Sequence, residues 1–336
     1  MRAIKIIAFI LIILVVGVLG LIYGLPSKTH MERKVVINAP AYKVYQELIT
    51  YRNFKKWSPW AVKDPAATYT YSGPEFGPGA MFSWSSETPD LGNGSMEILL
   101  TEKDKRVVWE MRFDGYESDP TASFLLNSIS EKETEVIWTY DEEGVEGFSK
   151  IFMLGIDGFL GGDYEKGLEL LKARVEGLPN FSMRIEPGRV NGYYYLGLED
   201  STLNEPSLLE TKMAINFGEL ESYMNQNDIE PKGKPLSMIT KSGNFNVKFV
   251  CGIPVAQQDT IFSDRIQMSY QDSTLVLVGR YYGSYAGIPN AYEEVEKFAS
   301  YYNYSITGGG WESYITGPES QVDTSQWLTE IYYPVR

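Results

Sequence analysis

Two stretches near the C-terminus share one strand-like pattern but differ at a position that could do chemistry. The first is Phe249-Val-Cys-Gly-Ile-Pro-Val255 and the second is Thr329-Glu-Ile-Tyr-Tyr-Pro-Val335. Aligning their prolines places Val250 opposite Glu330, so an apolar residue corresponds to a carboxylate. A buried carboxylate without a partner is costly, so its place opposite an apolar residue needs a reason. Glu330 is therefore the first candidate for a functional residue.

Strand alternation places Leu328, Glu330 and Tyr332 on one face of the expected strand. Because Val250 is the apolar counterpart of Glu330, we expect this face to be the covered one. The alternative is that Glu330 is a solvated carboxylate on the open face of an antiparallel sheet, where charged residues are common.

Glu312 is the second candidate carboxylate. Ser237-Met-Ile-Thr240 resembles Ser313-Tyr-Ile-Thr316, and this pairing sets Glu312 and Tyr314 opposite Leu236 and Met238. With 24 tyrosines in the chain, a single ring more often serves packing than ligand contact. The aromatic residues expected to include ligand contacts are Tyr195, Tyr282, Tyr285, Trp311 and Tyr314.

These residues belong to a duplicated unit that recurs after about 80 residues, a period that fits two half-domains. Each copy is predicted to run strand, helix, strand, strand, and Gly192-Tyr-Tyr-Tyr195 is paired with Gly279-Arg-Tyr-Tyr282. Pro206 and Pro289 suit the first turn of the two helices. The apolar residues with helical spacing are Leu209, Met213, Phe217, Leu220 and Met224 in the first copy and Tyr292, Val295, Phe298 and Tyr302 in the second. The pattern predicts an α+β domain with a cleft between two halves related by a pseudo-two-fold axis.

The stretches Trp311-Glu-Ser-Tyr-Ile-Thr-Gly-Pro318, Trp327-Leu-Thr-Glu-Ile-Tyr-Tyr-Pro-Val335 and Tyr282-Gly-Ser-Tyr285 resemble the GyrI-like effector-binding domain of bacterial AraC-type regulators. The resemblance covers residues 181–336. It implies a pocket between the repeats that binds drug-like, often cationic, molecules against aromatic rings and a buried glutamate. Glu330 falls on that family position.

The N-terminal segment has a different character. Residues 6–23 carry no charged or strongly polar side chain, which predicts a single transmembrane helix that anchors residues 1–30. Arg2 and Lys5 precede the apolar run and favour an N-terminus in the cytoplasm, so we expect the bulk of the chain to be extracytoplasmic.

Residues 31–177 form a third unit, with a strand, a helix that begins at Ala39-Pro40, several strands and a long closing helix. The motifs Ile37-Asn-Ala-Pro40, Phe54-Lys-Lys-Trp-Ser-Pro-Trp60 and Gly77-Pro-Gly-Ala80 resemble the START-like (SRPBCC) superfamily, which includes polyketide cyclases. The resemblance implies a curved sheet that grips the closing helix and leaves a cavity for lipids, sterols or aromatic compounds. The alternative is that large apolar side chains fill a solid core.

Composition excludes several functions. The chain has 44 acidic and 30 basic residues, and a net charge of −14 disfavours nucleic-acid partners. One histidine, His30, and one cysteine, Cys251, exclude catalytic groupings that need either residue and Cys/His zinc sites. We expect no catalytic residues that the sequence can name, no metal and no cofactor.

Two functions follow from these patterns. The favoured one is a membrane-anchored protein that sequesters or senses a small hydrophobic or cationic molecule. The alternative is a hydrolase or cyclase in which Glu330 acts as general base, because some GyrI-like proteins resemble enzymes that open strained rings.

Overall fold

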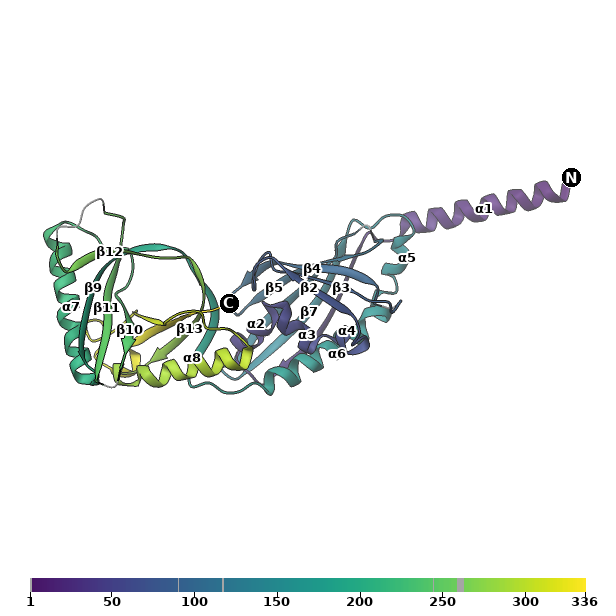
Figure 1. Cartoon of the computed structure of the whole chain (residues 1–336). Coiled ribbons are helices and arrows are strands. Elements are labelled where there is room, and N and C mark those ends of the chain that lie inside the picture. Colours follow the sequence, from purple (N-terminus) through teal and green to yellow (C-terminus); the bar gives the residue numbers. More distant parts are fainter. Residues whose placement is uncertain (1, 90, 117, 244, 259–262) are drawn as a thin grey trace. The chain divides into compact units, whose positions relative to one another are not determined.

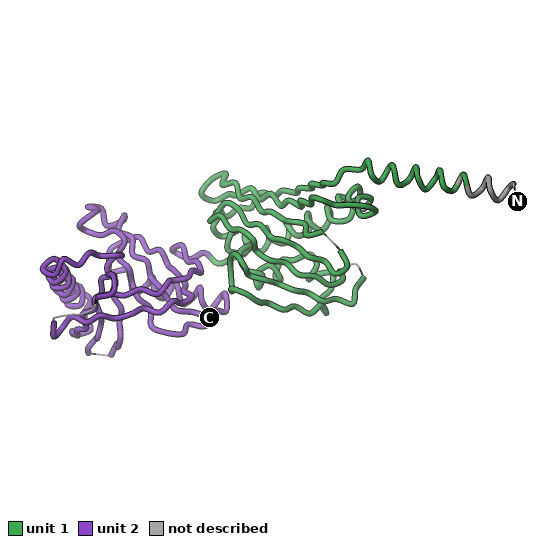
Figure 2. Tube along the Cα trace, turned by 90° about the horizontal axis from the view of Figure 1, so that it is seen from above, with its two compact units in different colours: residues 1–179 green, residues 180–336 purple. Residues whose placement is uncertain are grey.

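The chain divides into two compact units, unit 1 (Met1–Pro179) and unit 2 (Asn180–Arg336), which are coloured separately in Figure 2. The structure is a computed structural model that describes residues 2–89, 91–116, 118–243, 245–258 and 263–336. The side chains of residues 2–8, 10 and 152 lie outside this description. Both units combine helices with one antiparallel sheet, which confirms the predicted α+β class.

Unit 1 begins with helix α1 (Arg2–Gly24), drawn in purple in Figure 1. The predicted anchor, residues 6–23, falls within this helix, and some of its side chains are outside the described set. Among the described residues, no helix has both the length and the apolar character needed to span a membrane. The predicted anchor is therefore not confirmed.

The sheet of unit 1 has seven strands in the order β1-β7-β6-β5-β4-β3-β2, so successive strands from β2 to β7 are neighbours and β1 adds to the end. Alternation along β5 buries Val107, Trp109 and Met111 on one face, as its sequence predicts. The strands are β1 (Lys28–Ile37), β2 (Thr68–Ser72), β3 (Met81–Ser85), β4 (Asn93–Glu102), β5 (Arg106–Phe113), β6 (Thr121–Ser130) and β7 (Glu133–Glu143).

Five further helices belong to unit 1: α2 (Ala41–Leu48), α3 (Tyr51–Trp57), α4 (Pro59–Lys63), α5 (Ser149–Met153) and α6 (Ile156–Glu176). The long helix α6 buries Tyr164, Leu168, Leu171 and Val175 in one core with residues of α2, α3 and the strands. This arrangement of a sheet around a C-terminal helix is the one expected for residues 31–177. Arg174 of α6 also pairs with the fully buried Glu47 of α2.

Unit 2 contains two long helices, α7 (Pro206–Gln226) and α8 (Ile288–Tyr302), and two short 3₁₀ segments, η1 (Tyr285–Gly287) and η2 (Thr324–Gln326). Pro206 and Pro289 lie in the first turns, where a missing N–H is tolerated. Its strands are β8 (Arg184–Val190), β9 (Tyr193–Leu203), β10 (Leu236–Ser242), β11 (Asn246–Val255), β12 (Ile266–Gln271), β13 (Thr274–Tyr282), β14 (Trp311–Tyr314) and β15 (Leu328–Pro334).

The sheet of unit 2 has a symmetric strand order, β12-β9-β11-β10-β14-β15-β13-β8. The first copy, β9-α7-β10-β11, and the second, β13-α8-β14-β15, match the predicted strand, helix, strand, strand order. Each copy is also preceded by a strand that pairs with the other copy, because β8 lies beside β13 and β12 lies beside β9. A pseudo-two-fold axis passes between β10 and β14, where the halves meet.

The two helices cover one face of this sheet, which we call the helix-covered face. Helix α7 packs on the first copy and α8 on the second, and Figure 1 shows both helices on the same side of the strands. All nine apolar residues predicted from helical spacing lie in these two cores. The opposite side, which we call the second face, carries its own cluster of Leu236, Val276, Val278 and Trp311.

The strand registers correct part of the predicted repeat alignment. Pro254 lies opposite Tyr195 and Pro334 lies opposite Val276, so the counterpart of Tyr195 is Val276 and the predicted pairing with Tyr282 is wrong. The proline alignment makes Cys251 the counterpart of Ile331. Ser237 lies opposite Cys251 and Glu312 lies opposite Ile331. Ser237 and Glu312 are therefore the true counterparts.

Candidate functional site

The centre of unit 2 carries a buried carboxylate on the pseudo-two-fold axis. Ser237 of β10 and Glu312 of β14 face each other directly in the ladder that joins the two halves. Since they are counterparts in the repeat, the axis passes between them. Ser237 is 1 % exposed and Glu312 is 7 % exposed. The symmetry of the sheet thus brings one acid and one hydroxyl together at its midpoint.

The partners of Glu312 are neutral. The Tyr314 hydroxyl donates to Glu312 Oε2 at 2.6 Å, and Ser237 Oγ donates to the same oxygen at 2.9 Å. In the part of the chain that the structure describes, no basic side chain forms an ion pair with this carboxylate. Burial raises the pKa of Glu312, while hydroxyls of Tyr314, Ser237 and Tyr292 act in the opposite direction. The acid therefore lacks a positive partner.

Aromatic side chains from both copies pack around Tyr314, the hydrogen-bond partner of this acid. The Tyr314 ring lies 5.9 Å from Phe217 of α7 and 5.3 Å from Tyr285 of η1, measured between ring centroids. Trp327 lies 5.0 Å beyond Tyr285. We call Phe217, Tyr314, Tyr285 and Trp327 the aromatic cluster. A ring presents the negative face of its quadrupole to a cation. This cluster therefore suits an organic cation as well as an uncharged apolar molecule.

A second buried polar group lies on the same face. Thr329 is directly opposite Tyr314 in the β14–β15 ladder, so both side chains project from the helix-covered face. The Thr329 hydroxyl is fully buried and has no hydrogen-bond partner among the described residues. An unpaired buried hydroxyl costs about 1–3 kcal/mol, which a polar group of a ligand would offset.

Glu330 has a different environment from the one predicted. Arg280 Nε donates to Glu330 Oε1 at 3.1 Å, and the Tyr332 hydroxyl donates to Oε2. Arg280 also pairs with Glu186, so a small charge network crosses β8, β13 and β15. The residues of β15 that are fully covered are Thr329 and Ile331, which alternate with Glu330. The prediction that the Glu330 face is the covered one is wrong, because α8 packs on the Ile331 side.

The sheet separates the predicted site residues onto two faces. Glu312, Tyr314 and Tyr285 come together on the helix-covered side. On the second face, Trp311 stacks on Tyr332 with ring centroids 5.2 Å apart. The remaining predicted residues on that face are Glu330, Tyr195 and Tyr282. Three of the seven predicted residues, Glu312, Tyr314 and Tyr285, therefore lie together, and Glu330 lies apart from them.

Four residues at the Glu312 site escaped the sequence reasoning as ligand contacts: Ser237, Tyr292, Phe217 and Thr329. Ser237 is the instructive one. A repeat alignment shifted by a single position at this point would have paired it with Glu312. Helical spacing places Phe217 and Tyr292 on the buried faces of their helices, and this signal does not distinguish a ligand contact from a core residue.

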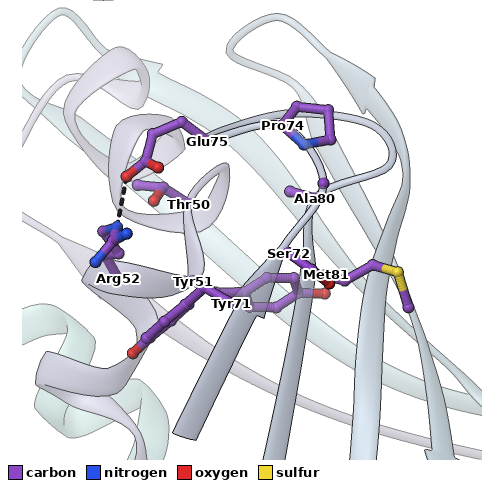
Figure 3. A pocket seen from close by; sticks show the side chains of 10 residues that line it. Thr50, Tyr51, Arg52, Tyr71, Ser72, Pro74, Glu75, Ala80 and Met81 are labelled. Carbon is purple, nitrogen blue, oxygen red and sulfur yellow. Dashed lines mark hydrogen bonds and ion pairs between the residues drawn. The ribbon is translucent and has the colours of Figure 1, made fainter. Parts of the chain in front are cut away.

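Unit 1 holds a small cavity at one end of its sheet, shown in Figure 3. Its volume is about 70 Å³, and its lining includes Tyr51, Tyr71 and Met81. Arg52 Nε donates to Glu75 Oε1 at 2.6 Å beside it, the contact dashed in Figure 3. Ligand pockets are usually about 300–1,000 Å³. This cavity is too small for the lipid, sterol or polycyclic ligand that the START-like resemblance implies.

The interior of unit 1 is filled with aromatic rings. Trp57, Trp109 and Trp138 are almost fully buried, and Trp138 stacks on Tyr164 with ring centroids 4.0 Å apart. Within the part of the chain that the structure describes, four polar atoms of this core have no hydrogen-bond partner: Tyr51 Oη, Trp109 Nε1, Trp138 Nε1 and Tyr164 Oη. A ligand in this interior would find hydrogen-bond donors, but the rings would have to move to admit it.

Metal and thiol chemistry find no support in the described residues. Among them, no group of three or more His, Cys, Asp or Glu side chains is placed to hold a metal ion. Cys251 is buried beside α7, and burial raises the pKa of its thiol to about 12. The thiol therefore remains protonated near neutral pH and is a poor nucleophile and a poor ligand.

Comparison with known proteins supports the first of the two domain assignments. Residues 28–176 match the family model described as polyketide cyclase / dehydrase and lipid transport. Unit 1 therefore carries a polyketide cyclase-like domain of the SRPBCC type. No curated protein matches the chain.

Several solved structures are similar to parts of this chain. The crystal structure of the EcmrR C-terminal domain is 17% identical, covers 46% of this chain and 98% of its own length, and has a TM-score of 0.39. The Zhui aromatase/cyclase from Streptomyces sp. R1128 is 13% identical over 44% of this chain and 94% of its own, with a TM-score of 0.34. Norcoclaurine synthase from Thalictrum flavum is 11% identical with the same two coverages and the same TM-score.

Proposed function

We propose that this chain is a small-molecule-binding protein whose C-terminal unit binds a lipophilic organic cation at Glu312. The observation that carries the proposal is the buried Glu312 carboxylate, which has three hydroxyl neighbours and no cation among the described residues. A ligand cation would supply the missing charge in a site where water screens little. The aromatic cluster would contribute cation–π attraction.

The proposal predicts charge selectivity that depends on one residue. In the full chain, Glu312→Gln should weaken binding of N-methylacridinium by at least about tenfold, which is about 1.4 kcal/mol. Binding of uncharged acridine, measured at alkaline pH, should change little, because glutamine preserves shape and hydrogen bonding. Fluorescence titration of both ligands measures the two affinities.

Glu330→Gln is the matched comparison, because it removes an acid from the second face of the same sheet. The site geometry predicts wild-type affinity for this variant, whereas the sequence-based hypothesis predicts a loss. A second variant, Ser237→Glu combined with Glu312→Ser, moves the carboxylate across the pseudo-two-fold axis and should retain cation binding. Equal affinity of wild type and Glu312→Gln for the cation would refute the proposal.

The alternative of a hydrolase with Glu330 as general base receives less support. Arg280 engages one oxygen of that carboxylate and the Tyr332 hydroxyl engages the other. Both oxygens are therefore already engaged by side chains of the protein, whereas a general base must present an oxygen to a bound water.

We also propose that α1 attaches the chain to a membrane. Its described apolar side chains other than Ile22 are exposed, among them Phe9, Leu14 and Leu21. A helix that is apolar all round is stable when other apolar groups or lipid surround it. Partition of the full chain between membrane and soluble fractions tests this attachment.

A further inference from the structure

The aromatic cluster forms a continuous series of rings that leads outward from Glu312. Tyr314 contacts the carboxylate, Tyr285 contacts Tyr314, and Trp327 contacts Tyr285. Glu312 is buried, while these three rings are half-buried. The series therefore connects the buried acid with the molecular surface beside η1 and the 315–327 segment.

Two exposed carboxylates, Glu210 and Glu319, lie near Tyr285, the middle ring of this series. Glu210 is three residues before Met213 on α7, and the Met213 sulfur lies 4.0 Å from the Tyr314 hydroxyl. Glu319 is two residues beyond Gly317, against which the Tyr285 hydroxyl packs. Glu210 and Glu319 also contribute to the raised pKa of Tyr285, after burial. Among the described residues neither acid forms an ion pair, so both remain available to an approaching cation.

We infer that the organic cation reaches Glu312 by way of Tyr285, with Glu210 and Glu319 attracting it to this place on the surface. The inference rests on the function proposed for Glu312 and adds a division of roles. Exposed charges act over long range and mainly raise the association rate constant. The buried acid and the rings hold the bound ligand, so they mainly set the dissociation rate constant.

Stopped-flow fluorescence of the full chain with N-methylacridinium separates the two rate constants. At an ionic strength of ~0.01 M, the double variant Glu210→Gln/Glu319→Gln should associate about three- to tenfold more slowly than wild type. Its dissociation rate constant should stay within about twofold, because neither acid touches the bound cation. At ~1 M salt the difference in association should disappear, because screening acts within about 3 Å.

A matched control is needed because the whole chain, with a net charge of −14, attracts any cation. Glu221→Gln/Glu293→Gln makes the same charge change at exposed positions of α7 and α8. This control should associate nearly as fast as wild type. A double variant at positions 210 and 319 that behaves like the control would overturn the inference.

Variants of the ring test the path itself. Tyr285→Phe keeps the aromatic face and should retain wild-type kinetics, whereas Tyr285→Leu should slow association and speed dissociation, because it removes the ring that connects Tyr314 with Trp327. Glu312→Gln distinguishes a failure of the access route from a failure of the binding site itself. A faster dissociation in Glu312→Gln, with no effect at positions 210 and 319, would overturn only the access route. Unchanged association and dissociation rate constants in Glu312→Gln would instead refute the proposed binding site.

Discussion

The ionisation of Glu312 is the residue-scale property on which the site depends. Desolvation opposes its charged form, and hydroxyls of Tyr314 and Ser237 only partly compensate. A charged state in this position is costly without a cation and becomes favourable with one. Binding should therefore be coupled to the loss of any proton that the acid still carries.

This environment predicts a pH-dependent stability that the Glu312→Gln variant lacks. The pKa of Glu312 is raised in the folded chain from 4.5, its ordinary value. Below that value the acid is protonated in both the folded and the unfolded states. Above it the unfolded chain ionises more readily, so the free energy of unfolding falls until pH passes the folded pKa. For each pH unit by which folding raises the pKa, the free energy of unfolding falls by about 1.4 kcal/mol over this range.

Denaturant unfolding of wild type and Glu312→Gln at a series of pH values measures this effect. The stability of the variant relative to wild type should increase as pH rises from acidic to neutral. Two profiles that stay parallel over this range would show that Glu312 ionises as easily in the folded chain as in the unfolded one.

At the residue scale, the sequence named both acids, but it placed Glu330, which the structure pairs with Arg280, ahead of Glu312, which has no ion pair among the described residues. The alternation in β15 defines two sets of residues, yet it does not say which set meets the helices. An apolar counterpart such as Val250 does not decide the question, because both faces of the unit 2 sheet carry apolar clusters. The partner of Glu330, Arg280, is distant in sequence and is adjacent only through the β13–β15 register.

At the scale of elements, the helices were more predictable than the strand alignment. Helical spacing and an N-terminal proline defined the buried sides of α7 and α8, because those signals are local. A correct repeat alignment requires the loop lengths, which the sequence does not show. The similar Gly-Tyr stretches that begin at positions 192 and 279 therefore led to a wrong pairing. The strands β8 and β12 were not predicted at all, because their partners belong to the other copy.

Close packing around Gly252 of β11 predicts how a larger residue there would change the stability of unit 2. A Cβ on Gly252 would lie 2.8 Å from the Tyr195 ring and 2.9 Å from a Leu236 methyl. Gly252→Ala should therefore lower the free energy of unfolding by about 1–3 kcal/mol, because the ring must shift. Cation binding by the remaining folded protein should not change, since Tyr195 lies on the second face.

Gly218→Ala is the control within the same unit. It lies in the interior of α7, and a Cβ there meets no atom within 4 Å. Alanine should stabilise the helix by about 0.5–1 kcal/mol. Thermal unfolding of both variants measures the two opposite shifts, and destabilisation by both would mean that the contacts of Gly252 are not the cause.

At the scale of the whole molecule, two units with separate cores share one chain and one apolar N-terminal helix. The motifs of residues 31–177 were sufficient to predict the fold of unit 1, because they recur at the junctions between its elements. They were not sufficient to predict how its interior is filled. The volume left by Trp57, Trp109 and Trp138 depends on ring packing that spacing alone does not reveal.

The proposed attachment of α1 predicts how the intact molecule fractionates. The full chain expressed in a bacterial host should remain with the membranes after an alkaline carbonate wash, which removes peripherally bound proteins. A chain without residues 2–24 should appear in the soluble fraction with the same affinity for N-methylacridinium. Recovery of the full chain in the soluble fraction would count against attachment.

Strand β8 pairs with the second copy and β12 with the first, so the two halves of unit 2 are joined as two subunits of a dimer would be. This arrangement bears on how many ligands one polypeptide can bind. Two identical chains joined in this way would have to place the same residue on both sides of their axis, either two carboxylates that repel each other or two uncharged groups. A fused duplication is free of that constraint, and here glutamate faces serine. The proposed site therefore has one carboxylate at its midpoint, and we expect each polypeptide to bind one monovalent cation.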